Sequence, residues 1–291
     1  MKRQNQAYLY ALLAILCWST IGSAFKISIH YIYFEHLLLI STLVAIIILF
    51  VILLTGKKLK NLKGLNFTDI VYSAFLGFLN PFLYYTVLLK AYELLPAQEA
   101  GTLNYIWPLV LVLLSIPLLR QHINFLSILA IFISFLGILM ISTHGHIISF
   151  KFSNPFGVLL ALGSAVFWAF YWIFNTKDKM EAVTRLFLNF CFGCIYILIT
   201  LFFIRPFRIP VWQGLLGSIY IGIFEMGIAF VFWIMALKLS KTTAMVSNLI
   251  YLSPFISLVL IHFIVGETIF ISTITGLIFI VSGILLQQKV S

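Results

Sequence analysis

Long apolar runs separated by short polar breaks fill almost the whole chain. Each run is about 18 to 25 residues long, which is the length that an α-helix needs to cross the hydrocarbon core of a bilayer. The pattern predicts ten membrane-spanning helices at residues 8–25, 33–54, 69–91, 96–118, 123–143, 155–175, 183–204, 213–237, 243–264 and 269–287. We therefore expect an all-α integral membrane protein whose loops are too short to hold a further folded domain.

The two halves of the chain resemble each other in the same order. The motif ALLAILCW, which ends at Trp18, resembles ALGSAVFW, which ends at Trp168. Further along, Gly-Phe-Leu-Asn80 matches Gly-Ile-Phe-Glu225 at an offset of 145. Ordered similarity that drifts only slightly in its offset is typical of an internal duplication.

The duplication predicts two five-helix repeats, residues 1–145 and 146–291. Because five is an odd number, the second repeat enters the membrane from the opposite face, and a pseudo-two-fold axis in the membrane plane relates the two. Inverted repeats of this kind are typical of secondary transporters, in which they surround a central cavity. Duplication that builds a rigid scaffold is the alternative.

Composition and charge agree with a membrane protein. The chain is 63% hydrophobic and 9% charged, with a mean hydropathy of +1.13 and a net charge of +10. If the N-terminus is cytoplasmic, 13 of the 18 Lys and Arg residues fall on the cytoplasmic side, as the positive-inside rule requires. The basic charge is thus explained by topology and lipid headgroups without a nucleic-acid partner. We expect a multi-pass protein of the bacterial inner membrane with both termini cytoplasmic.

Glu225 is the one charged residue within the apolar run 213–237. A charged side chain near the middle of a bilayer costs several kcal/mol unless it has a partner or a function. Three roles remain open for this carboxyl group. It could exchange a proton for substrate, neutralise the ammonium group of a substrate, or stay neutral as a structural hydrogen-bond donor.

Polar and aromatic side chains at helical spacing predict a cavity near the bilayer midplane. Amides in hydrocarbon must face protein or water, and aromatic rings can stack against aromatic or cationic solutes. The predicted substrate-binding residues are Trp18, Asn80, Tyr84, Asn104, Tyr105, Trp107, Trp168, Tyr171, Glu225, Asn248 and Tyr251. Hydrogen bonding between helices and ordinary packing are the alternatives for each of them.

Three prolines fall within predicted helices, where each removes a backbone donor and weakens the helix locally. These residues are Pro81, Pro108 and Pro254. They are candidate hinges for alternating access, and static kinks that shape the cavity are the alternative.

Other function classes lack the residues that they need. Cys191 and Cys194 have the spacing of a metal pair, but without further ligands nearby we interpret them as buried thiols and expect no metal or cofactor. Asp69 and Asp178 are the only aspartates, which rules out an Asp-rich diphosphate site. Neither HExxH nor a nucleophile elbow is present. We expect neither an enzyme nor a channel.

Several motifs resemble those of a known family. The first helix of each half ends in AxxxxxxW, NYIWP occupies 104–108, and the ninth helix closes on HFIVGE at 262–267. In these features the chain resembles the ten-helix EamA-type members of the drug/metabolite transporter superfamily. The resemblance implies a central cavity lined by the first, third, fourth, sixth, eighth and ninth helices, and efflux of metabolites. NYIWP, WST at 18–20 and WAFYWIFNTK at 168–177 resemble the branch that exports aromatic amino acids.

We therefore expect a secondary transporter that exports small metabolites, namely amino acids or related amphipathic or aromatic solutes, by alternating access. Proton coupling stays open, because it depends on Glu225 alone. A flippase or exchanger for lipid-linked or nucleotide-like metabolites is the alternative. The expected partners are a small-molecule substrate and the bilayer, and the expected assembly is a monomer or a weak homodimer.

Overall fold

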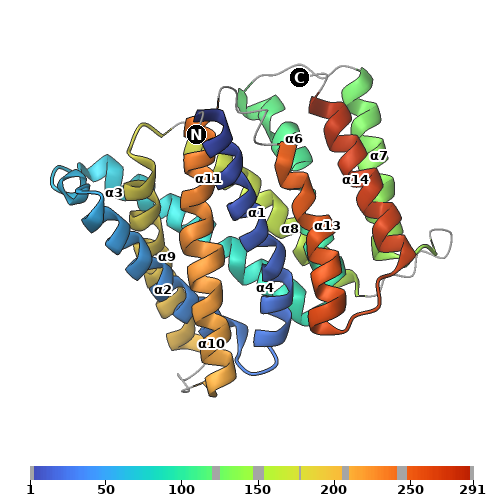
Figure 1. Cartoon of the computed structure of the whole chain (residues 1–291), viewed down its shortest axis with the longest axis horizontal. Helices are drawn as coiled ribbons and strands as arrows, with labels where there is room; N and C mark the ends of the chain where they lie inside the picture. Colours follow the sequence, from blue (N-terminus) through green and yellow to red (C-terminus); the bar gives the residue numbers. More distant parts are fainter. Residues whose placement is uncertain are drawn as a thin grey trace.

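A computed structural model describes residues 3–119, 125–146, 154–176, 178–204, 210–240 and 248–288. Every regular element in these ranges is helical (Figure 1). In chain order they are α1 (Arg3–Ser28), α2 (Phe34–Thr55), η1 (Leu59–Leu62), α3 (Phe67–Gly77), η2 (Phe78–Leu83), α4 (Tyr84–Leu94), α5 (Ala97–Asn104), α6 (Trp107–Leu119), α7 (Phe125–Ser142), α8 (Pro155–Thr176), α9 (Ala182–Ile204), α10 (Trp212–Ile221), η4 (Gly222–Gly227), α11 (Ile228–Leu239), η5 (Asn248–Tyr251), α13 (Leu252–Leu260), η6 (Ile261–Val265) and α14 (Ile271–Gln288).

Helices of the described ranges have the length and composition of membrane spans, which confirms a multi-pass membrane protein. Six are long and apolar enough to cross a bilayer, namely Arg3–Ser28, Phe34–Thr55, Phe67–Leu94, Pro155–Asn175, Ala182–Ile204 and Trp212–Leu239. Shorter apolar helices cover Leu129–Ile141, Leu249–Val265 and Ile271–Leu286. Large apolar side chains such as Phe202, which is 84% exposed, point outward, as lipid contact requires. The count of ten spans and the inversion of the repeats stay predictions.

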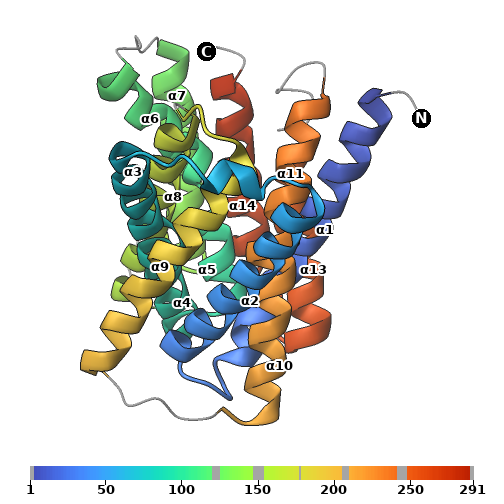
Figure 2. The ribbon, with the colours of Figure 1, turned by 90° about the vertical axis from the view of Figure 1, so that its left-hand side faces the viewer.

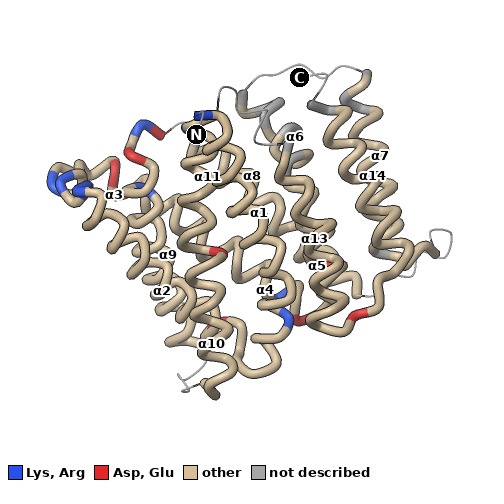
Figure 3. Tube along the Cα trace, in the orientation of Figure 1, with Lys and Arg blue, Asp and Glu red and all other residues tan. Residues whose placement is uncertain are grey.

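The helices run alongside one another as a bundle, with α7 next to α14 (Figures 1 and 2). The first residues of α1 and the last residues of α14 lie at the same end of the bundle (Figure 1). Lysine and arginine gather at that end, around η1 and the start of α3, with fewer at the opposite end (Figure 3).

Two of the long spans change their winding in the middle of the bundle. Between α3 and α4, η2 is a π-type turn in which Asn80 has an extended backbone, with φ −149° and ψ 120°. The residue before a proline is driven out of the helical region, and Pro81 follows here. Between α10 and α11, η4 is also a π-type turn and contains Glu225 between two glycines, Gly222 and Gly227. The break therefore comes from proline in one span and from glycine in the other.

The other two candidate hinge prolines lie at the start of helices. Pro108 is the second residue of α6, after a break that follows Asn104, and Pro254 is in the first turn of α13. First-turn N–H groups have no partner within the helix, so a proline costs little there. Unlike Pro81, these two prolines lie in the first turn of an α-helix, although α13 continues directly from η5. Whether any of the three acts as a hinge stays a prediction.

Glycines bring the two halves of the chain into close contact. A Cβ atom added at Gly137 of α7 would lie 2.5 Å from the carbonyl oxygen of Gly276 in α14. One added at Gly283 would lie 2.6 Å from the carbonyl oxygen of Ala130. Between these two contacts, the Ser134 hydroxyl donates to the Ile280 carbonyl at 3.4 Å. Backbones this close leave no space for a side chain, so α7 and α14 form one packed unit.

Two more glycines join elements that flank the π-type turns. A Cβ atom on Gly77 would collide with the carbonyl oxygen of Asn189 in α9, and one on Gly222 would lie 2.6 Å from that of Ser41 in α2. Gly77 and Gly222 are equivalent positions of the sequence repeat. Close approach of backbone to backbone is typical of helix packing in membranes, where small residues permit it.

A buried ion cluster fixes the end of the bundle that carries both termini. Arg185 of α9 is 2% exposed and pairs with Asp178 and, at 3.4 Å, with Asp69. Its guanidinium also donates to the Ser73 hydroxyl at 2.6 Å and lies 5.2 Å from the centre of the Tyr72 ring. The cluster ties α3 to α9 and gives both aspartates a structural role.

The glycine contacts predict opposite effects for two glycine-to-alanine substitutions. Gly77→Ala is expected to destabilise the protein by about 1–3 kcal/mol, because the new methyl group meets backbone that cannot move aside. Gly163→Ala in α8 has no atom within 4 Å of the new Cβ. It is expected to be neutral or stabilising by up to about 1 kcal/mol, through higher helix propensity. Thermal unfolding in detergent measures both, and equal effects would contradict the packing described.

Candidate functional site

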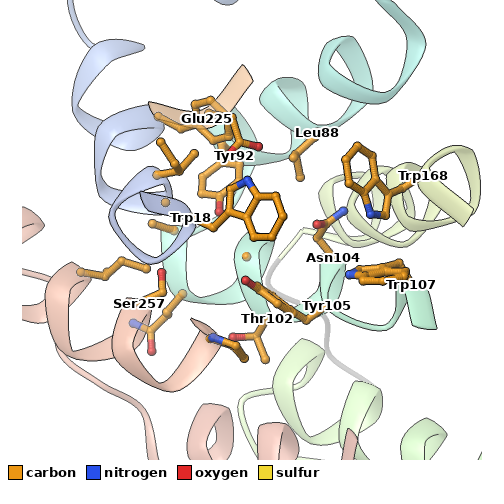
Figure 4. Close-up of a pocket in the computed structure, with 18 of the residues that line it drawn as sticks. Trp18, Leu88, Tyr92, Thr102, Asn104, Tyr105, Trp107, Trp168, Glu225 and Ser257 are labelled. Carbon is orange, nitrogen blue, oxygen red and sulfur yellow. The ribbon is translucent and has the colours of Figure 1, made fainter. Parts of the chain in front are cut away.

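A cavity lies in the middle of the bundle, enclosed by α1, α4, α5, α6, α8, η4, α11, η5, α13 and η6 (Figure 4). Its volume is about 840 Å³, including the part that is open to solvent. A lining that is mostly apolar and aromatic with a few polar groups is typical of a small-molecule binding site. The lining helices correspond to those that the family resemblance implied.

Aromatic rings form most of the cavity wall. Five of the six tryptophans of the chain line it, together with one phenylalanine and three tyrosines: Trp18, Trp107, Trp168, Trp172, Trp233, Phe25, Tyr84, Tyr92 and Tyr105. The rings of Trp18 and Trp233 are 5.5 Å apart, and those of Tyr84 and Trp168 are 4.6 Å apart at 31°. These contacts hold the rings in place, so flat apolar surfaces face the cavity.

Glu225 is the one charged side chain among the lining residues. It is 7% exposed, and the Tyr85 hydroxyl donates a hydrogen bond of 2.8 Å to its Oε1. Among the described residues, no Lys, Arg or His forms an ion pair with it. The π-type turn η4 carries this carboxyl group, and π-type turns inside helices are often found at functional sites. The cavity thus contains a carboxyl group without a cationic partner from the described protein.

Asn104 contributes a fixed neutral polar group at the cavity wall. Its Nδ2 donates to the Ser164 hydroxyl at 2.8 Å, and its Oδ1 accepts from the Tyr84 hydroxyl at 3.3 Å. The break that follows Asn104 ends α5, so this residue stands at the end of a short helix that borders the cavity. Gln98, Thr102 and Ser257 are further neutral polar side chains of the lining.

Most of the predicted substrate-binding residues lie at the cavity. Those that line it are Trp18, Tyr84, Asn104, Tyr105, Trp107, Trp168 and Glu225. Pro254, one of the candidate hinges, lines it as well. The side chain of Asn248 lies outside the described part of the structure. That these residues bind substrate stays a prediction.

Three predicted residues do not line the cavity. Asn80 is completely buried in η2, because the extended backbone before Pro81 turns its side chain off the helix face that it would share with Tyr84. Tyr171 stacks behind Trp168, with the ring centres 5.8 Å apart, and Tyr251 is also buried outside the wall. These three residues therefore lie outside the described cavity wall, and a role for them in substrate binding stays a prediction.

Several lining and supporting residues were not predicted. They are Tyr85, Tyr92, Gln98, Thr102, Trp172, Trp233 and Ser257. Trp172 follows Trp168 by one helical turn, so helical spacing could have found it. Nothing in the sequence pattern marks Tyr85. Its role is a hydrogen bond to Glu225, which lies in the other half of the chain.

Polar contacts join the elements that border the cavity at the end remote from both termini. Oε1 of Glu267, in the connection between η6 and α14, accepts from the backbone N–H of Ala97 at 2.8 Å. Gln98 donates to the carbonyl of Thr268 at 2.8 Å and accepts from the N–H of Phe270 at 3.2 Å. We call these contacts the Gln98–Glu267 latch, and they hold the start of α5 against the second half of the chain.

Two further contacts reinforce the same end. The Lys26 ammonium donates to the carbonyls of Tyr92 at 3.0 Å and Leu95 at 2.7 Å, which connects α1 to the end of α4. Glu99, completely buried, is hydrogen-bonded to His144, which follows α7. Side chains make these bonds, whereas backbone meets backbone at the glycine contacts.

Comparison with known proteins identifies the family. Residues 5–143 and 155–287 match the EamA-like transporter family. The chain belongs to this family. The assignment confirms the resemblance noted in the sequence, and it points to membrane transport rather than catalysis.

Two bacterial relatives have names of the same kind. The EamA-like chain is 26% identical over 222 residues to the uncharacterized transporter YvbV of Bacillus subtilis, covering 73% of this chain and 70% of the relative. It is 25% identical over 265 residues to an uncharacterized transporter of Clostridium kluyveri, covering 87% and 83%. Neither name states a substrate.

A solved crystal structure is similar to the EamA-like chain over nearly its whole length. The TM-score is 0.68 at 21% sequence identity, with 98% of this chain and 97% of the other covered. At this identity the likeness supports the fold alone.

The cavity wall predicts which introduced cysteines react with a water-soluble thiol reagent. With Cys17, Cys191 and Cys194 replaced by serine, Asn104→Cys is expected to be labelled several-fold faster than Tyr171→Cys. The reason is that Asn104 faces the cavity whereas Tyr171 is 1% exposed and lies behind Trp168. Labelling rates followed by mass spectrometry test this, and equal protection of both positions would contradict the cavity.

Proposed function

We propose that the protein is a secondary transporter that exports small metabolites across the bacterial inner membrane by alternating access. Amino acids or related amphipathic or aromatic solutes are the proposed substrates. The observation that carries the proposal is the aromatic cavity with a buried carboxyl group, found in a member of the EamA-like transporter family. Both relatives described above are bacterial and are called transporters.

Matched contacts between the halves support inverted repeats. At the offset of 146, Gly137 corresponds to Gly283, and Ala130 corresponds to Gly276. The contact of Gly137 with Gly276 therefore maps onto that of Ala130 with Gly283, and both are present. The partner in α14 moves from 283 to 276 as the position in α7 moves from 130 to 137, so these two equivalent helices run antiparallel. Inverted copies have this arrangement, whereas parallel copies would place equivalent helices in the same direction.

The second pair of glycine contacts supports the same relation. Gly77 of the first repeat packs against Asn189 of the second, and Gly222 of the second packs against Ser41 of the first. Inverted copies that can exchange conformations give inward-open and outward-open states around one site. We propose that the Gln98–Glu267 latch closes one end of the cavity and opens during the cycle.

Charge distribution supports cytoplasmic termini. Lys and Arg gather at the end of the bundle where α1 begins (Figure 3). Short cytoplasmic loops are enriched in these residues. We therefore propose that the latch faces the opposite side of the membrane.

We propose that the proton gradient drives transport and that Glu225 couples it to the solute. Among the described residues, the titratable groups that interact electrostatically with Glu225 are Cys17, Tyr84, Tyr85, Tyr92 and Tyr105. All are thiols or phenols, which are ordinarily neutral at physiological pH, so none of them compensates the negative charge. A proton or a cationic substrate group must do so, and exchange of one for the other would couple their movements.

A flippase or exchanger for lipid-linked or nucleotide-like metabolites remains the second candidate. Phosphate groups are usually bound by Arg, Lys or clustered N–H donors. No Lys or Arg is present among the described residues that line the cavity. This absence favours small solutes without phosphate.

Removal of the buried carboxyl group tests proton coupling. In proteoliposomes, Glu225→Gln is expected to abolish the pH dependence of solute exchange, because the amide cannot bind and release a proton. Glu93→Gln is the matched control, since Glu93 is exposed and pairs with Lys90 outside the cavity. Exchange of labelled aromatic amino acids and amines is measured with and without a proton gradient. Transport by Glu225→Gln that still follows the proton gradient would refute the coupling.

A further inference from the structure

The described lining of the cavity carries a charged side chain of one sign only. Among the described lining residues there is one acid, Glu225, and there is no Lys, Arg or His. The remaining polar groups are neutral amides, hydroxyls and indole N–H groups, with Gln98, Asn104 and Ser257 as examples. The described lining can therefore compensate a positive charge on a solute, and it contains no cationic side chain to compensate a negative one.

A lysine that adjoins a lining residue of α1 is held elsewhere. Lys26 of α1 follows the lining residue Phe25, but its ammonium donates to the carbonyls of Tyr92 and Leu95. It does not line the cavity. In this conformation Lys26 fastens two helix ends together and offers no charge to a bound carboxylate.

The aromatic wall suits a cation as well as an apolar body. Figure 4 shows Glu225, Tyr92 and Trp18 on one side of the space, with Trp168, Trp107 and Asn104 across from them. A cation over an aromatic ring gains about 0.5–2 kcal/mol, and more when water is excluded. A carboxylate at the same place faces the negative ring surfaces and the like charge of Glu225. Its desolvation is then left without a compensating cation.

We propose that the cavity binds a monovalent organic cation. Its ammonium group lies against Glu225, and its aromatic or alkyl body lies among the tryptophans. The site discriminates against solutes that carry a carboxylate or a phosphate. This inference rests on the transport function proposed above and narrows the substrate class from amino acids to amines.

Four compounds that share one indole ring and differ in charge test the proposal. They are tryptamine, a cation; tryptophan, a zwitterion; indole, which is neutral; and indole-3-acetate, an anion. Binding to the full-length protein in detergent is measured by isothermal titration calorimetry at neutral pH. We expect tryptamine to bind about tenfold or more tightly than the other three, which corresponds to about 1.4 kcal/mol from the carboxylate and the rings together.

Two variants locate the source of this preference. Glu225→Gln is expected to lose most of the preference for tryptamine over indole, because the carboxylate is removed and only the aromatic rings remain to favour the cation. Glu93→Gln removes an exposed carboxylate outside the cavity and is expected to retain the full preference. Size-exclusion profiles and thermal unfolding show whether each variant is folded. A folded Glu225→Gln protein that keeps the tryptamine preference would overturn the assignment of the cation site to this residue.

Other outcomes separate this inference from the transport function. Binding of tryptophan or indole-3-acetate as tight as that of tryptamine, or no measurable binding of tryptamine, would overturn the inference. Saturable transport of tryptophan in proteoliposomes without transport of tryptamine would overturn it too, and would leave the transporter proposal in place. Preferential binding of tryptamine without transport of any of the four compounds would support the cation site and count against the transport function.

Discussion

The free-energy cost of exposing unpaired polar groups to lipid hydrocarbon governs how this chain is arranged. Backbone N–H and C=O groups that leave the helical pattern must be enclosed by protein or must line a wet cavity, since lipid offers them no partner. The described breaks in the long spans, at Asn80, after Asn104 and around Glu225, lie inside the bundle. The lipid-facing surface instead consists of regular helices with exposed apolar side chains such as Phe202. The irregular backbone and the buried carboxyl group thus occupy the same interior region, and this region contains the cavity.

The equivalent positions of the repeat have diverged in a way that gives the cavity its single charge. Asn80 and Glu225 both lie in π-type turns that follow a glycine packed against the opposite half. In the first half Pro81 forces an extended backbone at Asn80 and packs closely against Gly193 of α9, so the amide is fully buried. In the second half Met226 takes the place of the proline, and Glu225 reaches the cavity. Fold symmetry is therefore compatible with an asymmetric site.

The sequence predicted the parts of this structure that depend on local pattern. Apolar runs marked the long spans, and repeat matching with helical spacing placed Trp18, Trp168 and Glu225 at the cavity. It failed where a break in the helix changes which way a side chain points. Asn80 and Tyr84 share a face only in an unbroken helix, and the backbone before Pro81 is extended. Contacts between distant segments, such as Tyr85 with Glu225 or Gln98 with the turn at Thr268, have no signature in spacing at all.

The two kinds of contact between the halves differ in how easily they can change. At Gly137–Gly276 and Gly77–Asn189 backbone meets backbone without an intervening side chain, so any sliding meets immediate steric resistance. Around the cavity, the latch consists of single hydrogen bonds from Gln98 and Glu267, each of which water can replace. If the cavity opens alternately to the two sides, movement at the latch is cheaper than movement at the glycine contacts. The glycine-packed pairs then act as rigid bodies, and α1, α5 and α13, which border the cavity, are the elements that move.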